Sequence, residues 1–181
     1  MPGNWPLFIG LSHGEGIVAT VIGQTYNSEI RIFAAFVSEA ISLRRHLLEY
    51  IQPWLSANAH RLSLLGAYED FPNVQLKSET FQAAREILAG EWASISKSWE
   101  IRRAAMLDIL TKAQAFSFKP VVQFDPVGTV QLSQALTRGV YEKDKAEKKT
   151  YHVVNAFSLL LARLEIWKVR PKDTKLPRLP H

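Results

Sequence analysis

The sequence contains no cysteine, and this absence excludes two classes of protein. Disulfide-stapled scaffolds and thiolate metal sites both require that residue. No apolar run approaches the roughly 18 residues that a membrane-spanning helix needs, and the first residues lack the basic and apolar regions of a secretory signal. We therefore expect a soluble, cytoplasmic protein without a membrane partner.

Two functional motifs are absent as well. No Gly-x-x-x-x-Gly-Lys-Ser/Thr loop occurs, so we expect neither a nucleotide-binding loop nor a nucleotide-driven motor in this chain. No Gly-x-Ser-x-Gly elbow points to acyl transfer. The 181 residues suffice for one globular domain with a buried core. Whether that domain acts alone or within a larger assembly stays open.

The net charge of +5 is concentrated near the C-terminus. Of the 22 basic and 17 acidic residues, residues 168–181 contain five basic and one acidic, which leaves 17 and 16 for the rest. Prolines in this segment disfavour a helix, so we expect a domain over residues 1–167 and an extended basic tail. The tail is either an arm that contacts nucleic acid phosphates or a solvated terminus. Its basic residues are Lys168, Arg170, Lys172, Lys175 and Arg178.

The first 36 residues predict three strands. Residues 7–11, 17–22 and 29–36 are apolar, β-branched or alternating, and glycine or polar turn sequences separate them. Strands joined by such short turns pair in antiparallel order.

Beyond these strands the apolar residues recur mainly at helical spacing. A short apolar segment at 62–68 is typical of a central parallel strand. The order predicts an α/β protein whose mixed sheet, a three-strand antiparallel meander plus parallel strands, is flanked by helices. This order is that of the ribonuclease H-like fold. The predicted later elements are helices over 38–54, 78–88, 98–112, 129–138 and 151–167, and strands over 62–68 and 120–124.

Four segments carry a more specific resemblance. Residues 7–14 match an opening strand of the form apolar-Gly-apolar-Asp-x-Gly, and residues 64–67 match a strand that ends in Gly-Asp. Residues 124–141 match a run from a short strand through a helix to a tyrosine, and residues 151–157 match His-x-x-Asp-Ala-Leu. In this order and spacing the chain resembles the nuclease domain of phage terminase large subunits, from Leu7 to about Trp167.

The resemblance implies an enzyme that cuts DNA with two divalent ions held by three aspartates. Those aspartates fall on Ser12, Ala67 and Asn155, none of which carries a charge. Two dications held close together repel each other without anionic ligands. We therefore expect a terminase-nuclease-like protein that is catalytically degenerate and holds no cofactor.

An alternative keeps the enzyme active by using displaced carboxylates. Glu15, Glu69, Asp70 and Asp125 lie near predicted strand ends and are either Mg²⁺ or Mn²⁺ ligands or solvated turn residues. His13 and His152 would approach the same edge and form a further candidate metal site, although their spacing matches no metal motif.

A segment rich in tryptophan and basic residues, between the second and third predicted helices, is a candidate contact for DNA. The alternative is that its aromatic residues pin a loop to the domain. We expect double-stranded DNA or phage packaging proteins as partners, and a protein-interaction module without DNA binding is the third interpretation. The residues of this segment are Trp92, Lys97, Trp99, Arg102 and Arg103.

Overall fold

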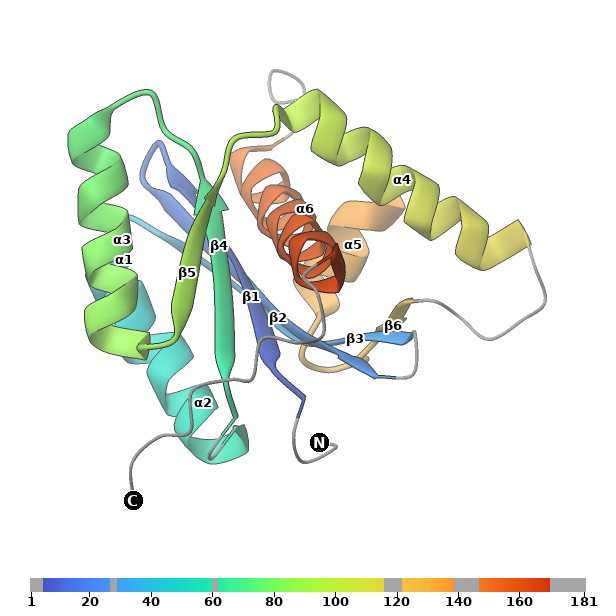
Figure 1. Cartoon of the computed structure of the whole chain (residues 1–181), viewed down its shortest axis with the longest axis horizontal. Helices are drawn as coiled ribbons and strands as arrows, with labels where there is room; N and C mark the ends of the chain where they lie inside the picture. The colour runs from blue at the N-terminus through green and yellow to red at the C-terminus, as the bar shows by residue number, and fades with distance from the viewer. Residues whose placement is uncertain (1–4, 27–28, 60–61, 116–121, 139–146, 170–181) are drawn as a thin grey trace.

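The computed structural model describes residues 5–26, 29–59, 62–115, 122–138 and 147–169. Within these ranges one sheet is covered by helices on both faces (Figure 1). The strands are β1 (Leu7–Gly14), β2 (Ile17–Tyr26), β3 (Glu29–Glu39), β4 (Leu64–Glu69), β5 (Glu91–Ile95) and β6 (Val122–Phe124). The helices are α1 (Leu43–His46), the π-helical turn η1 (Leu47–Ile51), α2 (Gln52–Asn58), α3 (Val74–Leu88), α4 (Trp99–Ala115), α5 (Val130–Arg138) and α6 (Lys148–Val169).

The six strands are ordered β5-β4-β1-β2-β3-β6. β1, β2 and β3 pair in antiparallel order, whereas β4 is parallel to β1, β5 to β4 and β6 to β3. The predicted mixed sheet with its three-strand meander is confirmed. The parallel register sets Gly10 opposite Ala67 and Leu11 opposite Tyr68, so the ends of β1 and β4 lie at one edge of the sheet.

One strand was not predicted. The sequence places residues 91–95 in a loop between two helices, but they form β5, which pairs with β4 at the edge of the sheet. The strand is short, and its alternation of buried Trp92 and Ile95 with more exposed residues is weak. Its position depends on the neighbouring strand more than on its own sequence.

The two faces of the sheet have separate apolar clusters. One cluster joins the sheet to α4, α5 and α6, and the other joins it to η1 and α3. Figure 1 shows α6 lying over the strands, with α4 and α5 beside it. α6 therefore occupies the centre of the molecule.

The burial of α6 exceeds what its predicted apolar stripe implies. Every residue from 151 to 164 is buried, polar ones included. Gly10 makes this close approach possible, because a Cβ atom there would lie 1.9 Å from the carbonyl oxygen of Ala156. The sequence Tyr151–Leu164 is thus a core helix that carries polar side chains into the interior.

The predicted boundary between domain and tail falls inside α6, which continues to Val169 and includes Lys168. Arg170, Lys172, Lys175 and Arg178 lie outside the described residues. Among the helices that are described, none has the length and hydropathy needed to cross a bilayer.

Candidate functional site

Four elements, β1, β4, α4 and α6, bring polar side chains together at the end of β1 and β4. Asn155 of α6 donates from Nδ2 to Ser12 Oγ of β1 at 3.0 Å and to Glu69 Oε2 of β4 at 3.0 Å. Arg102 and His152 complete the group, which we call the strand-end cluster: Ser12, Glu69, Arg102, His152 and Asn155. The predicted meeting of Ser12 with Asn155 is therefore observed.

Ala67 does not take part, which corrects the prediction that it would be the third member. It lies two residues before Glu69 in the same strand and belongs to an apolar cluster with Leu159 and Ala162 of α6. Because side chains alternate along a strand, Ala67 and Glu69 share a face, and Glu69 is the one nearer the strand end. That the cluster corresponds to the catalytic aspartates of terminases stays a prediction.

Arg102 reaches the cluster from α4. Its guanidinium donates to Asn155 Oδ1 at 2.7 Å and to Glu69 Oε1 at 3.2 Å. It also donates to Ser158 Oγ at 3.3 Å and to the carbonyl oxygen of Lys97. The residue is only 3% exposed, so its guanidinium lies inside the protein and not on a surface loop, and its predicted contact with DNA stays a prediction.

The hydrogen-bond partners of Asn155 fix the orientation of its amide group. A guanidinium only donates, so Asn155 Oδ1 accepts from Arg102 and Nδ2 faces Ser12 and Glu69. Ser12 Oγ accepts from Asn155 and also shares a hydrogen bond with His152 Nδ1, 2.9 Å away, in which the donor depends on the His152 tautomer.

The charges around the cluster nearly cancel. Glu69 is the carboxylate and Arg102 is the cation, and the two form an ion pair. Burial, together with the negative charge of Glu69, raises the pKa of Tyr151 to about 12. Burial and the nearby His152 ring lower the pKa of His13 to about 4. The environment thus favours neutral forms for the titratable groups beside the ion pair.

The displaced carboxylates do not assemble into a second centre. Glu15 forms an ion pair with Lys148 at 3.0 Å, and Asp70 forms one with Lys77. Asp125 accepts from the backbone N–H groups of residues 127 and 128 at 3.0 and 2.6 Å, and so shapes the turn before α5.

The histidine site is not formed either. His13 Nε2 lies 2.7 Å from the hydroxyl of Thr80, while His152 faces Ser12. Across the described ranges no three His, Cys, Asp or Glu side chains are placed to hold a metal ion.

The segment rich in tryptophan and basic residues is divided by the fold. Trp92 is buried against Gly66 and donates from Nε1 to the carbonyl of Ala89 at 2.7 Å, so it is not on a loop surface. Trp99 contacts the ring of Tyr151 with centroids 5.3 Å apart. Lys97 is exposed and pairs with Glu165, and Arg103 is half-buried. Contact of Lys97 or Arg103 with DNA stays a prediction.

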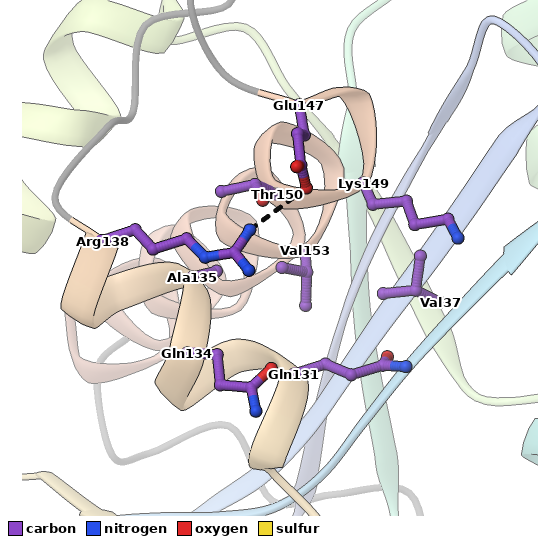
Figure 2. A pocket seen from close by; sticks show the side chains of 9 residues that line it. All are labelled: Val37, Gln131, Gln134, Ala135, Arg138, Glu147, Lys149, Thr150 and Val153. Atoms are coloured by element: carbon purple, nitrogen blue, oxygen red, sulfur yellow. Dashed lines mark hydrogen bonds and ion pairs between the residues drawn. The ribbon is translucent and has the colours of Figure 1, made fainter.

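A polar cavity that sequence reasoning missed lies between α5, β3 and the start of α6. It has a volume of about 150 Å³. Figure 2 shows Arg138 reaching from α5 toward Glu147, and their ion pair measures 3.1 Å. The sequence shows Arg138 at the end of a predicted helix. It does not show the cavity, because the other lining residues come from distant segments of the chain. The lining residues are Val37, Gln131, Gln134, Ala135, Arg138, Glu147, Lys149, Thr150 and Val153.

No protein-family profile matches the chain, and no curated protein matches it by sequence. Solved structures do match. The nuclease domain of the large terminase g2p from bacteriophage SPP1, with bound Mn, is 15% identical with a TM-score of 0.53, over 87% of this chain and 86% of that one. The human cytomegalovirus terminase nuclease domain is 9% identical with a TM-score of 0.54, over 88% and 81%.

The large terminase of a thermophilic bacteriophage, in complex with ATP-gamma-S, is 8% identical with a TM-score of 0.65. The alignment covers 91% of this chain but only 42% of the phage protein, so the chain spans less than half of that terminase. At such identities the similarity establishes the fold. The chain has the ribonuclease H-like fold of terminase nuclease domains.

Proposed function

We propose that this chain is a terminase-nuclease-like protein that binds DNA or DNA-packaging proteins and does not cut DNA by a two-metal route. One observation carries the proposal: the strand-end cluster contains a single carboxylate, Glu69, and that carboxylate is paired with Arg102. Ser12 and Asn155 supply neutral groups that are already hydrogen-bonded to each other. Two divalent ions need several anionic oxygens in close contact.

Binding without cleavage agrees with the rest of the molecule. The basic residues beyond Lys168 place most of the net charge near the C-terminus. In the folded part, Arg138 and Lys149 line a polar cavity, and each pairs with an exposed carboxylate. Exposed ion pairs contribute little free energy, so a phosphate group can replace those carboxylates at low cost. DNA phosphates are therefore a chemically reasonable ligand.

Incubation with supercoiled plasmid tests the loss of cleavage. The protein should leave the plasmid uncut in Mn²⁺ and in Mg²⁺. Nicking that EDTA stops would contradict the proposal and support an endonuclease built on displaced acids. The Glu69→Gln variant, purified in the same way, is the comparison: loss of nicking in this variant would assign the activity to the carboxylate of the strand-end cluster.

Gel retention of double-stranded DNA tests the proposed binding of DNA. Retention should weaken steeply as salt increases, because the contacts are to phosphates. It should weaken further when the basic residues of the tail are replaced by glutamine. Absence of retention at low salt would refute DNA binding and favour the protein-interaction alternative. The variant for this test replaces Arg170, Lys172, Lys175 and Arg178.

A further inference from the structure

We propose that the Arg102 guanidinium is a built-in cation that takes the place of metal ions in the strand-end cluster. The inference deepens the proposed loss of two-metal cleavage and rests on it. Metal binding is what the fold suggests, since the SPP1 terminase domain was solved with bound Mn. The residues present in this chain do not fit such a site, and Arg102 is the physical reason.

The oxygens that surround Arg102 are of the kind that a hard divalent ion requires. They are a carboxylate of Glu69, the amide oxygen of Asn155, the hydroxyl of Ser158 and the carbonyl of Lys97. Mg²⁺ and Mn²⁺ take carboxylate, carbonyl and water oxygens. Here these oxygens already accept hydrogen bonds from one buried guanidinium, whose side chain is 1% exposed.

The orientation of the Asn155 amide also disfavours a metal ion in the strand-end cluster. Its amide oxygen faces Arg102, so its NH₂ group faces Ser12 Oγ and Glu69 Oε2. An NH₂ group presents protons and repels a cation. A metal ion that reached Glu69 and Ser12 would require the amide to flip, and the flip would break the 2.7 Å bond to Arg102.

The charge balance points the same way. Glu69 and Arg102 together carry no net charge, and a divalent ion would add two positive charges beside a buried guanidinium. The Arg102 side chain is 1% exposed, and charges of the same sign repel more strongly beside a buried group than in bulk water. Arg102 also links α4 to β4 and α6, a connection that a shared metal ion can provide in other proteins. The cluster should therefore be complete without metal.

The chain offers a matched control at the other end of α6. Arg163 is also buried, with its side chain 2% exposed, and it pairs with Glu91 at 2.7 Å. Both arginines are thus buried cations with one carboxylate partner. Arg163 is bonded to β5 rather than to the strand-end cluster, so its removal changes the total charge equally and leaves the cluster intact.

The test compares three variants by their thermal unfolding in Mn²⁺ and in EDTA. The Ser12→Asp/Asn155→Asp double variant restores two carboxylates but keeps Arg102. Adding Arg102→Met should create a Mn²⁺ site, because three carboxylates then face one another without a cation. We expect low stability in EDTA, recovery in Mn²⁺, and a Kd for Mn²⁺ at least tenfold lower than that of the double variant. Adding Arg163→Met instead should leave Mn²⁺ affinity unchanged.

Equal Mn²⁺ affinity in the double variant and in the Arg102→Met triple variant would overturn the inference. So would an Arg163→Met variant that binds Mn²⁺ as well as the Arg102→Met one. If the triple variants do not fold, Mn²⁺ binding can still be tested on the wild-type protein by nuclear magnetic resonance. Its isotope-labelled amides should show no Mn²⁺-induced broadening centred on Glu69 and Asn155, and such broadening would refute the proposal.

These failures can be told apart from failure of the proposed function. Metal-dependent plasmid nicking by the wild-type protein overturns both. A Mn²⁺ affinity that does not depend on Arg102, with wild-type protein that leaves plasmid intact, overturns only the role of Arg102.

Discussion

Replacing Glu69 by glutamine should lower the free energy of unfolding by about 2–3 kcal/mol. Loss of one partner of a buried ion pair typically costs about 3–5 kcal/mol, because the other charge is left uncompensated. The cost here is lower because the Glu69 side chain is 30% exposed and admits water. In addition, Arg102 keeps its other acceptors, Asn155, Ser158 and the Lys97 carbonyl.

Urea unfolding measures this change, and thermal unfolding gives an independent value. For a chain of this size a loss of 2–3 kcal/mol lowers the Tm by roughly 4–12 °C. The control is Glu86→Gln, which breaks the pair between Glu86 and Arg44, whose side chains are both more than half exposed. That pair should contribute less than about 0.5 kcal/mol.

A double-mutant cycle assigns the effect to the ion pair. Arg102→Met removes the buried cation, so Glu69→Gln should cost much less in that background. We expect a coupling energy of about 2 kcal/mol. A Glu69→Gln variant within about 0.5 kcal/mol of the wild type, or a coupling below that value, would show that Arg102 does not depend on Glu69 for its burial.

Three further predictions concern other parts of the molecule. Burial lowers the pKa of His46 from 6.5 to about 4, so the unfolded chain binds a proton first and stability falls as pH drops below 6.5. This loss is about 2 kcal/mol between pH 7 and pH 5, and an unchanged pH profile of urea unfolding in His46→Gln would contradict it. Gly10→Ala should lower the free energy of unfolding by about 3 kcal/mol or more, because its Cβ would meet the backbone of α6. Gly16→Ala is the control, because it has open space around it and should cost roughly 1 kcal/mol. Equal losses of stability in the two variants would refute the close contact. Arg138→Gln should weaken DNA retention and reduce the salt slope by about one, and the same effect from Arg44→Gln on the opposite face would show that only net charge matters.

The elements of the fold were largely predictable because their sequence patterns are local. Turn residues separate three apolar segments, and short turns permit only antiparallel pairing of the first strands. The helices α3 to α6 were each predicted within a few residues of their observed bounds. β5 was missed because a five-residue edge strand has too little periodicity to be separated from a loop.

Tertiary contacts that cross the sheet were not predictable in the same way. The sequence shows Trp92, Lys97, Arg102 and Arg103 as one cluster of aromatic and basic residues. In the structure Trp92 packs on one face of the sheet. Arg102 extends from α4 to Asn155 of α6 on the other face. Residues that are close in sequence were separated because a strand and a helix present them to different layers.

The difference between Ala67 and Glu69 shows what sets the chemistry of the cluster. Both side chains face α6, and only their distance along β4 determines which one meets Ser12 and Asn155. Parallel pairing places Ala67 opposite Gly10, two residues before Ser12. Glu69 is therefore level with Ser12, where a carboxylate can meet both the amide of Asn155 and the guanidinium of Arg102. Because that register carries a carboxylate to the level of Ser12, the burial of Arg102, and with it the metal exclusion that we propose, depends on the pairing of β1 with β4.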